Sequence, residues 1–177
     1  MKSILVFGAS NSKESINKKL AVWSANQLEH VNIDLVDLKD YEMAIYGIDL
    51  ENEIGIPDQA KKFKEKVHAA DGILVSFAEH NGGYTAVFKN LFDWISRIES
   101  PIWANKPMFL MATSPGGRGA KSVLNLVTTT FPHRGGDIVA SFSLPFFEKK
   151  FSEVNGITDE TLLAEFKKQL KAFEKAL

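Results

Sequence analysis

The chain has 177 residues, of which 45% are hydrophobic and 24% charged, and its formal net charge is -1. This balance argues against nucleic-acid binding, and the absence of cysteine excludes disulfides, thiolate catalysis and thiolate metal sites. We expect one domain covering residues 1–177. No apolar run approaches the ~20 residues of a membrane span, and the start does not resemble a signal peptide, so we expect a cytoplasmic protein.

Strand and helix signals alternate along the chain. Pro57 is expected at the first position of the second helix, and Thr158 as the cap of the last one. The alternation predicts an α/β fold with a parallel sheet and right-handed crossovers. In chain order the predicted elements are a strand at Ser3–Phe7, a helix at Ser15–Glu29, a strand at Ile33–Leu38, a helix from Pro57 to Ala70, a strand at Gly72–Phe77, a helix at Thr85–Ile98, a strand at Met108–Thr113, a helix at Gly119–Phe131, a strand at Ile138–Leu144 and a helix at Thr158–Leu177.

Two aromatic-rich segments stand out in this pattern. The helix predicted at Thr85–Ile98 has an apolar face too wide to cover one sheet alone, so we expect it to bury a second face against another subunit or a long loop. On that basis a homodimer or a tetramer is expected. The long connection Pro145–Gly156 contains three phenylalanines, which predict either packing onto the body of the protein or a lid.

The segment GASNSKESIN, Gly8–Asn17, lies where the first predicted strand ends and a helix begins. Free backbone amides and the helix dipole favour an anion there, and Ser10, Ser12 and Ser15 add hydroxyl groups. The segment matches neither the Walker pattern nor Gly-x-Gly-x-x-Gly, so a terminal monophosphate fits it better than a pyrophosphate. An ordinary polar turn is the alternative.

Two further loops follow the third and fourth predicted strands. Ser76–Asn90 contains an Asn-Gly-Gly turn signal, and Thr113–Ala120 places three glycines between a strand and a helix. Ligands of open parallel sheets bind outside the carboxyl ends of the strands, where the strand order reverses. A molecule with a phosphate at one end and a broad planar ring at the other, such as FMN, suits all three loops. Plain strand-to-helix connections are the alternative for the second and third.

These loops carry a family resemblance over nearly the whole chain. Ala9–Asn17 followed by Leu20 and Ala21, Ala78–Asn81, and the string Phe88–Trp94 with its Lys-Asn-x-x-Asp-Trp pattern are its most specific parts. The sequence resembles the NADPH-dependent FMN reductases, flavodoxin-like NAD(P)H oxidoreductases that include quinone, azo-dye and chromate reductases. The resemblance implies a flavodoxin-like three-layer sandwich with a five-stranded parallel sheet in the order 2-1-3-4-5.

The same resemblance implies an FMN site with three departures from the family pattern. Ser12 replaces the usual arginine of the phosphate loop, and Ala78 and His80 replace a proline and a tyrosine beside the flavin. We therefore expect weaker FMN binding or a different set of contacts. The implied site comprises Ser10, Ser12, Ser15, Ile16 and Asn17 at the phosphate, Ala78, Glu79, His80 and Asn81 along the ring, and Ser114, Gly116, Gly117 and Gly119 at its polar edge.

The implied activity is hydride transfer from NADPH or NADH through flavin N5 to a free flavin, a quinone or a similar planar oxidant. No catalytic side chain and no metal site are expected, and the partners are small molecules rather than nucleic acid or membrane. Two alternatives stay open: an FMN-binding electron carrier, and a flavodoxin-like module whose cofactor binding is weakened or lost. Lys89, Asn90, Asp93 and Trp94 are expected to be structural.

Overall fold

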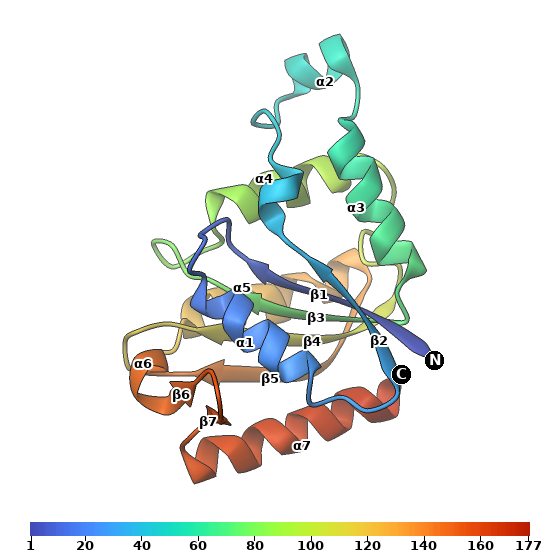
Figure 1. Cartoon of the computed structure of the whole chain (residues 1–177). Helices are drawn as coiled ribbons and strands as arrows, with labels where there is room; N and C mark the ends of the chain where they lie inside the picture. The colour runs from blue at the N-terminus through green and yellow to red at the C-terminus, as the bar shows by residue number, and fades with distance from the viewer.

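Residues 1–177, described by a computed structural model, form a five-stranded parallel sheet with helices on both faces (Figure 1). The strand order is β2-β1-β3-β4-β5, which confirms the predicted sheet and its order. Every residue of β3 is buried, as expected for a parallel strand covered on both faces. The strands are β1 (Lys2–Ala9), β2 (Val31–Val36), β3 (Gly72–Phe77), β4 (Lys106–Thr113) and β5 (Gly136–Leu144).

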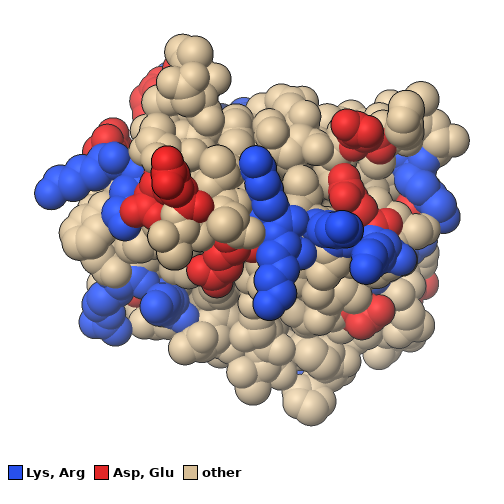
Figure 2. All heavy atoms as spheres, turned by 90° about the horizontal axis from the view of Figure 1, so that it is seen from below, with Lys and Arg blue, Asp and Glu red and all other residues tan.

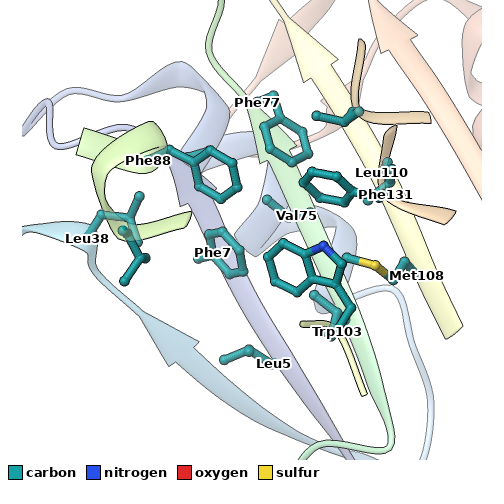
Figure 3. Packing of buried hydrophobic residues seen from close by; sticks show 14 of the residues in the cluster. Leu5, Phe7, Leu38, Val75, Phe77, Phe88, Trp103, Met108, Leu110 and Phe131 are labelled. Atoms are coloured by element: carbon teal, nitrogen blue, oxygen red, sulfur yellow. The ribbon is translucent and has the colours of Figure 1, made fainter. Parts of the chain in front are cut away.

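Alternate side chains of each strand point to opposite faces of the sheet and build two separate cores. One core contains Ile4 and Val6 of β1 and lies under α1 (Ile16–Ala25) and α7 (Glu160–Ala176). The larger core contains Phe7 and a group of packed aromatic rings that Figure 3 shows. The helices over the larger core are α3 (Asp58–Ala69), α4 (Ala86–Ile95) and α5 (Lys121–Thr130).

Several predicted helix ends were wrong by one to four residues. Asp159, not Thr158, caps α7, because its carboxylate accepts a hydrogen bond from the backbone N–H of Leu162. Pro57 is the residue before α3 rather than its first residue. The first helix ends at Ala25 instead of Glu29, since the chain must turn back into β2 six residues later.

Short elements without an apolar stripe were not predicted. The helix α2 (Ile48–Ile54) buries none of its residues and projects from the body of the protein in Figure 1. The others are the 3₁₀ turns η1 (Leu38–Tyr41) and η2 (Pro132–Arg134), the one-turn helix α6 (Phe147–Lys150), and the antiparallel pair β6 (Phe151–Ser152) and β7 (Gly156–Ile157).

The wide apolar face of α4 is covered within the same chain. Trp94 is fully buried, and its indole Nε1 donates to the carbonyl of Ala44 at 2.9 Å. Asn90 accepts a hydrogen bond from the backbone N–H of Tyr46 and donates to the carbonyls of Met43 and Ala44. The long loop before α2 therefore occupies this face, as one of the two expected alternatives had it. The face consequently gives no support to the homodimer expected from it, and Asn90 and Trp94 have a structural role.

The aromatic connection after β5 also packs onto the body. Phe147 is buried, and the β6–β7 hairpin lies beside α1, where Phe151 meets the ring of Trp23 edge to face at 5.8 Å. Gly156 closes the hairpin with φ +69°, directly against the same indole. A Cβ atom on Gly156 would lie 1.9 Å from Trp23 Cε2, so no side chain fits there unless the indole moves.

Gly156→Ala is expected to destabilise the protein by about 2–4 kcal/mol, because it adds an overpacking clash to the cost of a left-handed alanine. Gly82→Ala is the matched control: Gly82 has φ +80°, yet nothing lies within 4 Å of the position that a Cβ atom would take there. It should lose only about 1 kcal/mol. Urea unfolding monitored by circular dichroism measures both variants, and equal losses would show that the contact with Trp23 is unimportant.

Candidate functional site

Three loops meet at the carboxyl ends of the central strands. The first loop (residues 10–15) follows β1, the second (residues 78–85) follows β3, and the third (residues 114–120) follows β4. The last residues of β1 and β3 are paired, Gly8 with Ser76 and Ala9 with Phe77, so the first two loops leave the sheet side by side. The strand order reverses between β1 and β3, which is where ligands bind in open α/β sheets.

Asn17, on the first turn of α1, connects the ends of β3 and β4 at this edge. Its side-chain oxygen accepts hydrogen bonds from the hydroxyl of Ser76 at 2.7 Å and from the backbone N–H of Thr113 at 3.0 Å. Its amide nitrogen donates to the carbonyl of Thr113 at 3.1 Å. Only 2% of Asn17 is exposed. Its side chain therefore fixes the position of the first loop relative to the ends of β3 and β4. The resemblance had implied a phosphate contact for this residue.

The first loop presents hydrogen-bond donors. Ser10 Oγ accepts from the backbone N–H of Ser12, and Ser15 Oγ accepts from that of Lys18, capping α1. With their oxygens engaged in this way, both hydroxyl hydrogens can donate to a ligand. The backbone N–H groups of Ile16 and Asn17, first in the helix, form no hydrogen bond within the chain. Amides and hydroxyls at a helix start make an environment for an anion.

Ser12 itself is exposed, and no arginine substitutes for it in the loop. Lys18, in the first turn of α1, is paired: its ammonium group lies 2.6 Å from Asp37 just after β2. Burial alone would raise the pKa of Asp37, but hydrogen bonds from Lys18 and from the backbone N–H of Lys39 outweigh it and hold that pKa below its ordinary value. The ion pair between Lys18 and Asp37 thus connects α1 to the end of β2.

The second loop forms a tight hairpin. His80 and Gly83 exchange two backbone hydrogen bonds of 3.1 Å, while Asn81 and Gly82 adopt positive φ between them. The side chain of Glu79 turns away to the start of α5, where its carboxylate accepts from the backbone N–H of Val123 at 3.0 Å. His80 and Asn81 are exposed. Ala78 and Glu79 are half-buried.

The third loop uses its glycines in different ways. Gly119 has φ +58°, and its carbonyl accepts from the Ser143 hydroxyl at 2.7 Å. A Cβ atom on Gly117 would touch the ring of Phe146, whereas Gly116 has open space around it. The backbone of this loop is held by the connection after β5, whose residues Phe146 and Phe147 donate to the carbonyls of Gly116 and Ser114.

One positioning residue escaped the sequence analysis. Thr85 caps α4 by accepting from the N–H of Phe88, and its hydroxyl donates to the carbonyl of Ala9 at 2.9 Å. It thereby ties the second loop to the first. Its position before an apolar helical stripe indicates a helix cap. The hydrogen bond to Ala9 joins residues 76 positions apart, so no local sequence pattern reveals it.

The first loop thus supplies hydrogen-bond donors for an anion. The second and third loops supply small residues and backbone groups. The predicted residues of the three loops are brought to one edge, with Asn17 and Glu79 turned into the protein. No three His, Asp or Glu side chains converge as a metal site, and no helix is long and apolar enough to cross a bilayer. On the face shown in Figure 2, acidic and basic side chains are interspersed.

Sequence comparisons agree with this geometry. The family model described as NADPH-dependent FMN reductase matches residues 2–149. A Mycoplasma pneumoniae protein of uncharacterised function is 30% identical over 161 residues, covering 88% of this chain and 94% of the relative. A 2-hydroxy-1,4-benzoquinone reductase from Burkholderia sp is 32% identical over 118 residues, which are 66% of this chain and 62% of that enzyme.

Solved structures share the fold. FerB of Paracoccus denitrificans, a flavoenzyme NAD(P)H:(acceptor) oxidoreductase, superposes with a TM-score of 0.77 at 24% identity, covering 99% of this chain and 97% of its own. An apo NADH:FMN oxidoreductase superposes with a TM-score of 0.72 at 17% identity, covering 100% of this chain and 90% of its own.

Proposed function

Because the chain belongs to the NADPH-dependent FMN reductase family, we propose that it transfers a hydride from NAD(P)H to a second planar acceptor, a free flavin or a quinone. The observation that carries the proposal is the gathering of the donor-rich first loop, the second loop and the glycine-rich third loop at the carboxyl ends of β1, β3 and β4, next to the strand-order reversal between β1 and β3. FMN, when bound, supplies the hydride chemistry. The chain binds and orients it. The cytoplasmic location stays a prediction.

The first loop fits the phosphate of FMN. Ser10 and Ser15 offer hydroxyl donors, and the amides of Ile16 and Asn17 point from the positive end of the α1 dipole. Ser12 adds a further exposed hydroxyl. Hydroxyls and amides therefore do here what an arginine side chain does in the family pattern. Neutral donors bind phosphate less strongly than a charge-assisted pair, so we propose a dissociable rather than permanently bound cofactor.

The second and third loops fit the ring through their backbones. Because the Glu79 carboxylate is engaged by α5, the second loop meets a ligand through the main chain of Ala78–Asn81. Gly116, which has open space where a Cβ atom would lie, lets a flat ring approach the third loop closely, whereas Gly117 packs on Phe146. We propose that the amide groups of these loops orient toward the polar edge of the ring, where they favour negative charge.

Ser10→Ala is expected to raise the Kd of FMN about tenfold and to leave the Kd of riboflavin unchanged, because only FMN carries the phosphate. Fluorescence titration measures both ligands, and Ser96→Ala, on the far end of α4, is the control. A protein that binds neither flavin would overturn the proposal. Steady-state NADPH oxidation with a quinone separates the enzyme from an FMN-binding electron carrier, which would show no turnover.

We also propose a homodimer, and place its contact on the projecting α2 rather than on α4. Ile45, Ile48 and Ile54 around α2 are 84%, 54% and 56% exposed, an unusual set of apolar side chains on one projection. Ile48→Asp is expected to shift the chain toward monomer in sedimentation equilibrium without lowering its thermal stability. A wild-type chain that sediments as a monomer at all concentrations would contradict the dimer.

A further inference from the structure

A cavity lies next to the first loop, on the outer side of α1. It has a volume of about 390 Å³ and is lined by residues of the first loop, of α1 and of the β6–β7 hairpin. Figure 1 shows where α1 and this hairpin lie in the fold. The sheet-facing side of α1 carries Leu20, Ala21 and Ser24, so the cavity follows the opposite side of the helix. Its principal lining residues are Lys13, Lys19, Val22, Trp23, Phe151 and Glu153.

The floor of this pocket, which we call the α1–hairpin pocket, is apolar and aromatic. Trp23 and Phe151 meet edge to face with ring centroids 5.8 Å apart, and Trp23 also packs on Phe166 at 4.9 Å. Phe151 in turn stacks on Phe147 at 4.6 Å. These contacts hold both rings in place while each stays partly exposed to the pocket. A rigid aromatic floor suits a flat apolar ligand.

The rim of the pocket carries three lysines, Lys13, Lys18 and Lys19, and one carboxylate, Glu153. Lys13 forms no ion pair within the chain, whereas Lys19 lies 2.8 Å from Glu153 and 3.5 Å from Glu14. The hydrogen bond from Lys19 to Glu153 raises the pKa of Lys19, so this ammonium group stays charged. Lys18, also on the rim, is held by Asp37. Of the three lysines on the rim, Lys13 is therefore the one that forms no ion pair.

We propose that the α1–hairpin pocket binds a planar aromatic anion the size of a bicyclic carboxylate, with its ring on Trp23 and Phe151 and its charge beside Lys13. The volume lies at the lower end of the range for small-molecule sites, about 300–1,000 Å³. Apolar rings adjoin ammonium groups along the same helix face, which is the pairing such a ligand requires. This site is separate from the proposed flavin site, with which it shares only the edge formed by Lys13 and Ser15.

The test uses the FMN-saturated protein and three probes in isothermal titration calorimetry. The probe 2-naphthoate has both ring and charge, 2-naphthamide has the ring alone, and decanoate has the charge without a ring. We expect 2-naphthoate to bind at least about tenfold more tightly than either of the others, since each lacks one of the two contacts. Binding should also quench the part of the tryptophan emission that comes from Trp23, which is the tryptophan a ligand can contact because Trp94 and Trp103 are fully buried.

Two variants locate the ligand. Lys13→Gln, at an exposed position, and Phe151→Ala are each expected to weaken 2-naphthoate about tenfold, whereas Lys62→Gln on α3 removes the same charge from another surface and should change nothing. Lys13→Gln keeps the test decisive should Phe151→Ala unfold. The proposal is overturned if 2-naphthamide binds equally well, if Lys13→Gln leaves the affinity unchanged, or if 2-naphthoate displaces FMN.

Discussion

Replacing Asn17 with alanine is expected to lower the free energy of unfolding by about 3–5 kcal/mol, because it leaves three buried polar groups without a hydrogen-bond partner. The hydroxyl of Ser76 and both backbone groups of Thr113 lose their partner, and neither residue is more than 1% exposed. For a chain of this length the loss corresponds to a fall in Tm of about 10 °C. FMN affinity should fall as well, since the first and third loops lose the side chain that sets their spacing.

Asn11→Ala provides the control within the same loop. Asn11 is exposed, and its amide donates only to the carboxylate of Glu42 at 3.0 Å, so its removal should cost no more than about 0.5 kcal/mol. Thermal and urea unfolding of the two variants give the comparison. If Asn17→Ala is as stable as Asn11→Ala, the side chain does not hold the sheet edge together, and a direct role at the phosphate becomes the better explanation of this position.

Sequence periodicity predicted the parallel sheet and its main helices because each of these elements buries an apolar face. Leu20 and Ala21 of α1, and Phe166 and Leu170 of α7, repeat at helical spacing against the sheet. The same reasoning failed for α2, which buries nothing and so carries no stripe. It also left the partner of Trp94 open between another subunit and a long loop, since periodicity shows that a face is buried but not which segment covers it.

The candidate site, too, could be predicted only in part from the sequence. Residue types and loop positions predicted an anion end and a ring end, because amides, hydroxyls and glycines act through local chemistry. Long-range hydrogen bonds could not be predicted: Glu79 reaches α5 across 44 residues, and Asn17 reaches Thr113 across 96. These two side chains support the loops from within, a role that spacing along the chain does not distinguish from ligand contact.

The three glycines of the third loop should respond differently to alanine, and the differences separate structural from ligand-facing positions. Gly119→Ala is expected to destabilise the protein by about 3 kcal/mol or more, because it combines overpacking with an unfavourable φ. Its Cβ would lie 2.4 Å from the Ser143 hydroxyl oxygen and 3.0 Å from the backbone nitrogen of Pro145 at φ +58°. The backbone of Pro145 cannot move aside without displacing the end of β5.

Gly117→Ala should be milder, because the atom it meets, Cζ of Phe146 at 2.6 Å, belongs to a side chain that is 39% exposed and can rotate. Gly116→Ala meets nothing within 4 Å and should leave stability within about 0.5 kcal/mol of wild type. If the flavin ring lies on this loop, Gly116→Ala nevertheless weakens FMN, because its methyl group projects where the ring would approach. Unfolding and FMN titration on the three variants separate these effects. Unchanged FMN affinity in a stable Gly116→Ala protein would move the ring off the third loop, while the structural demand on Gly119 would stand.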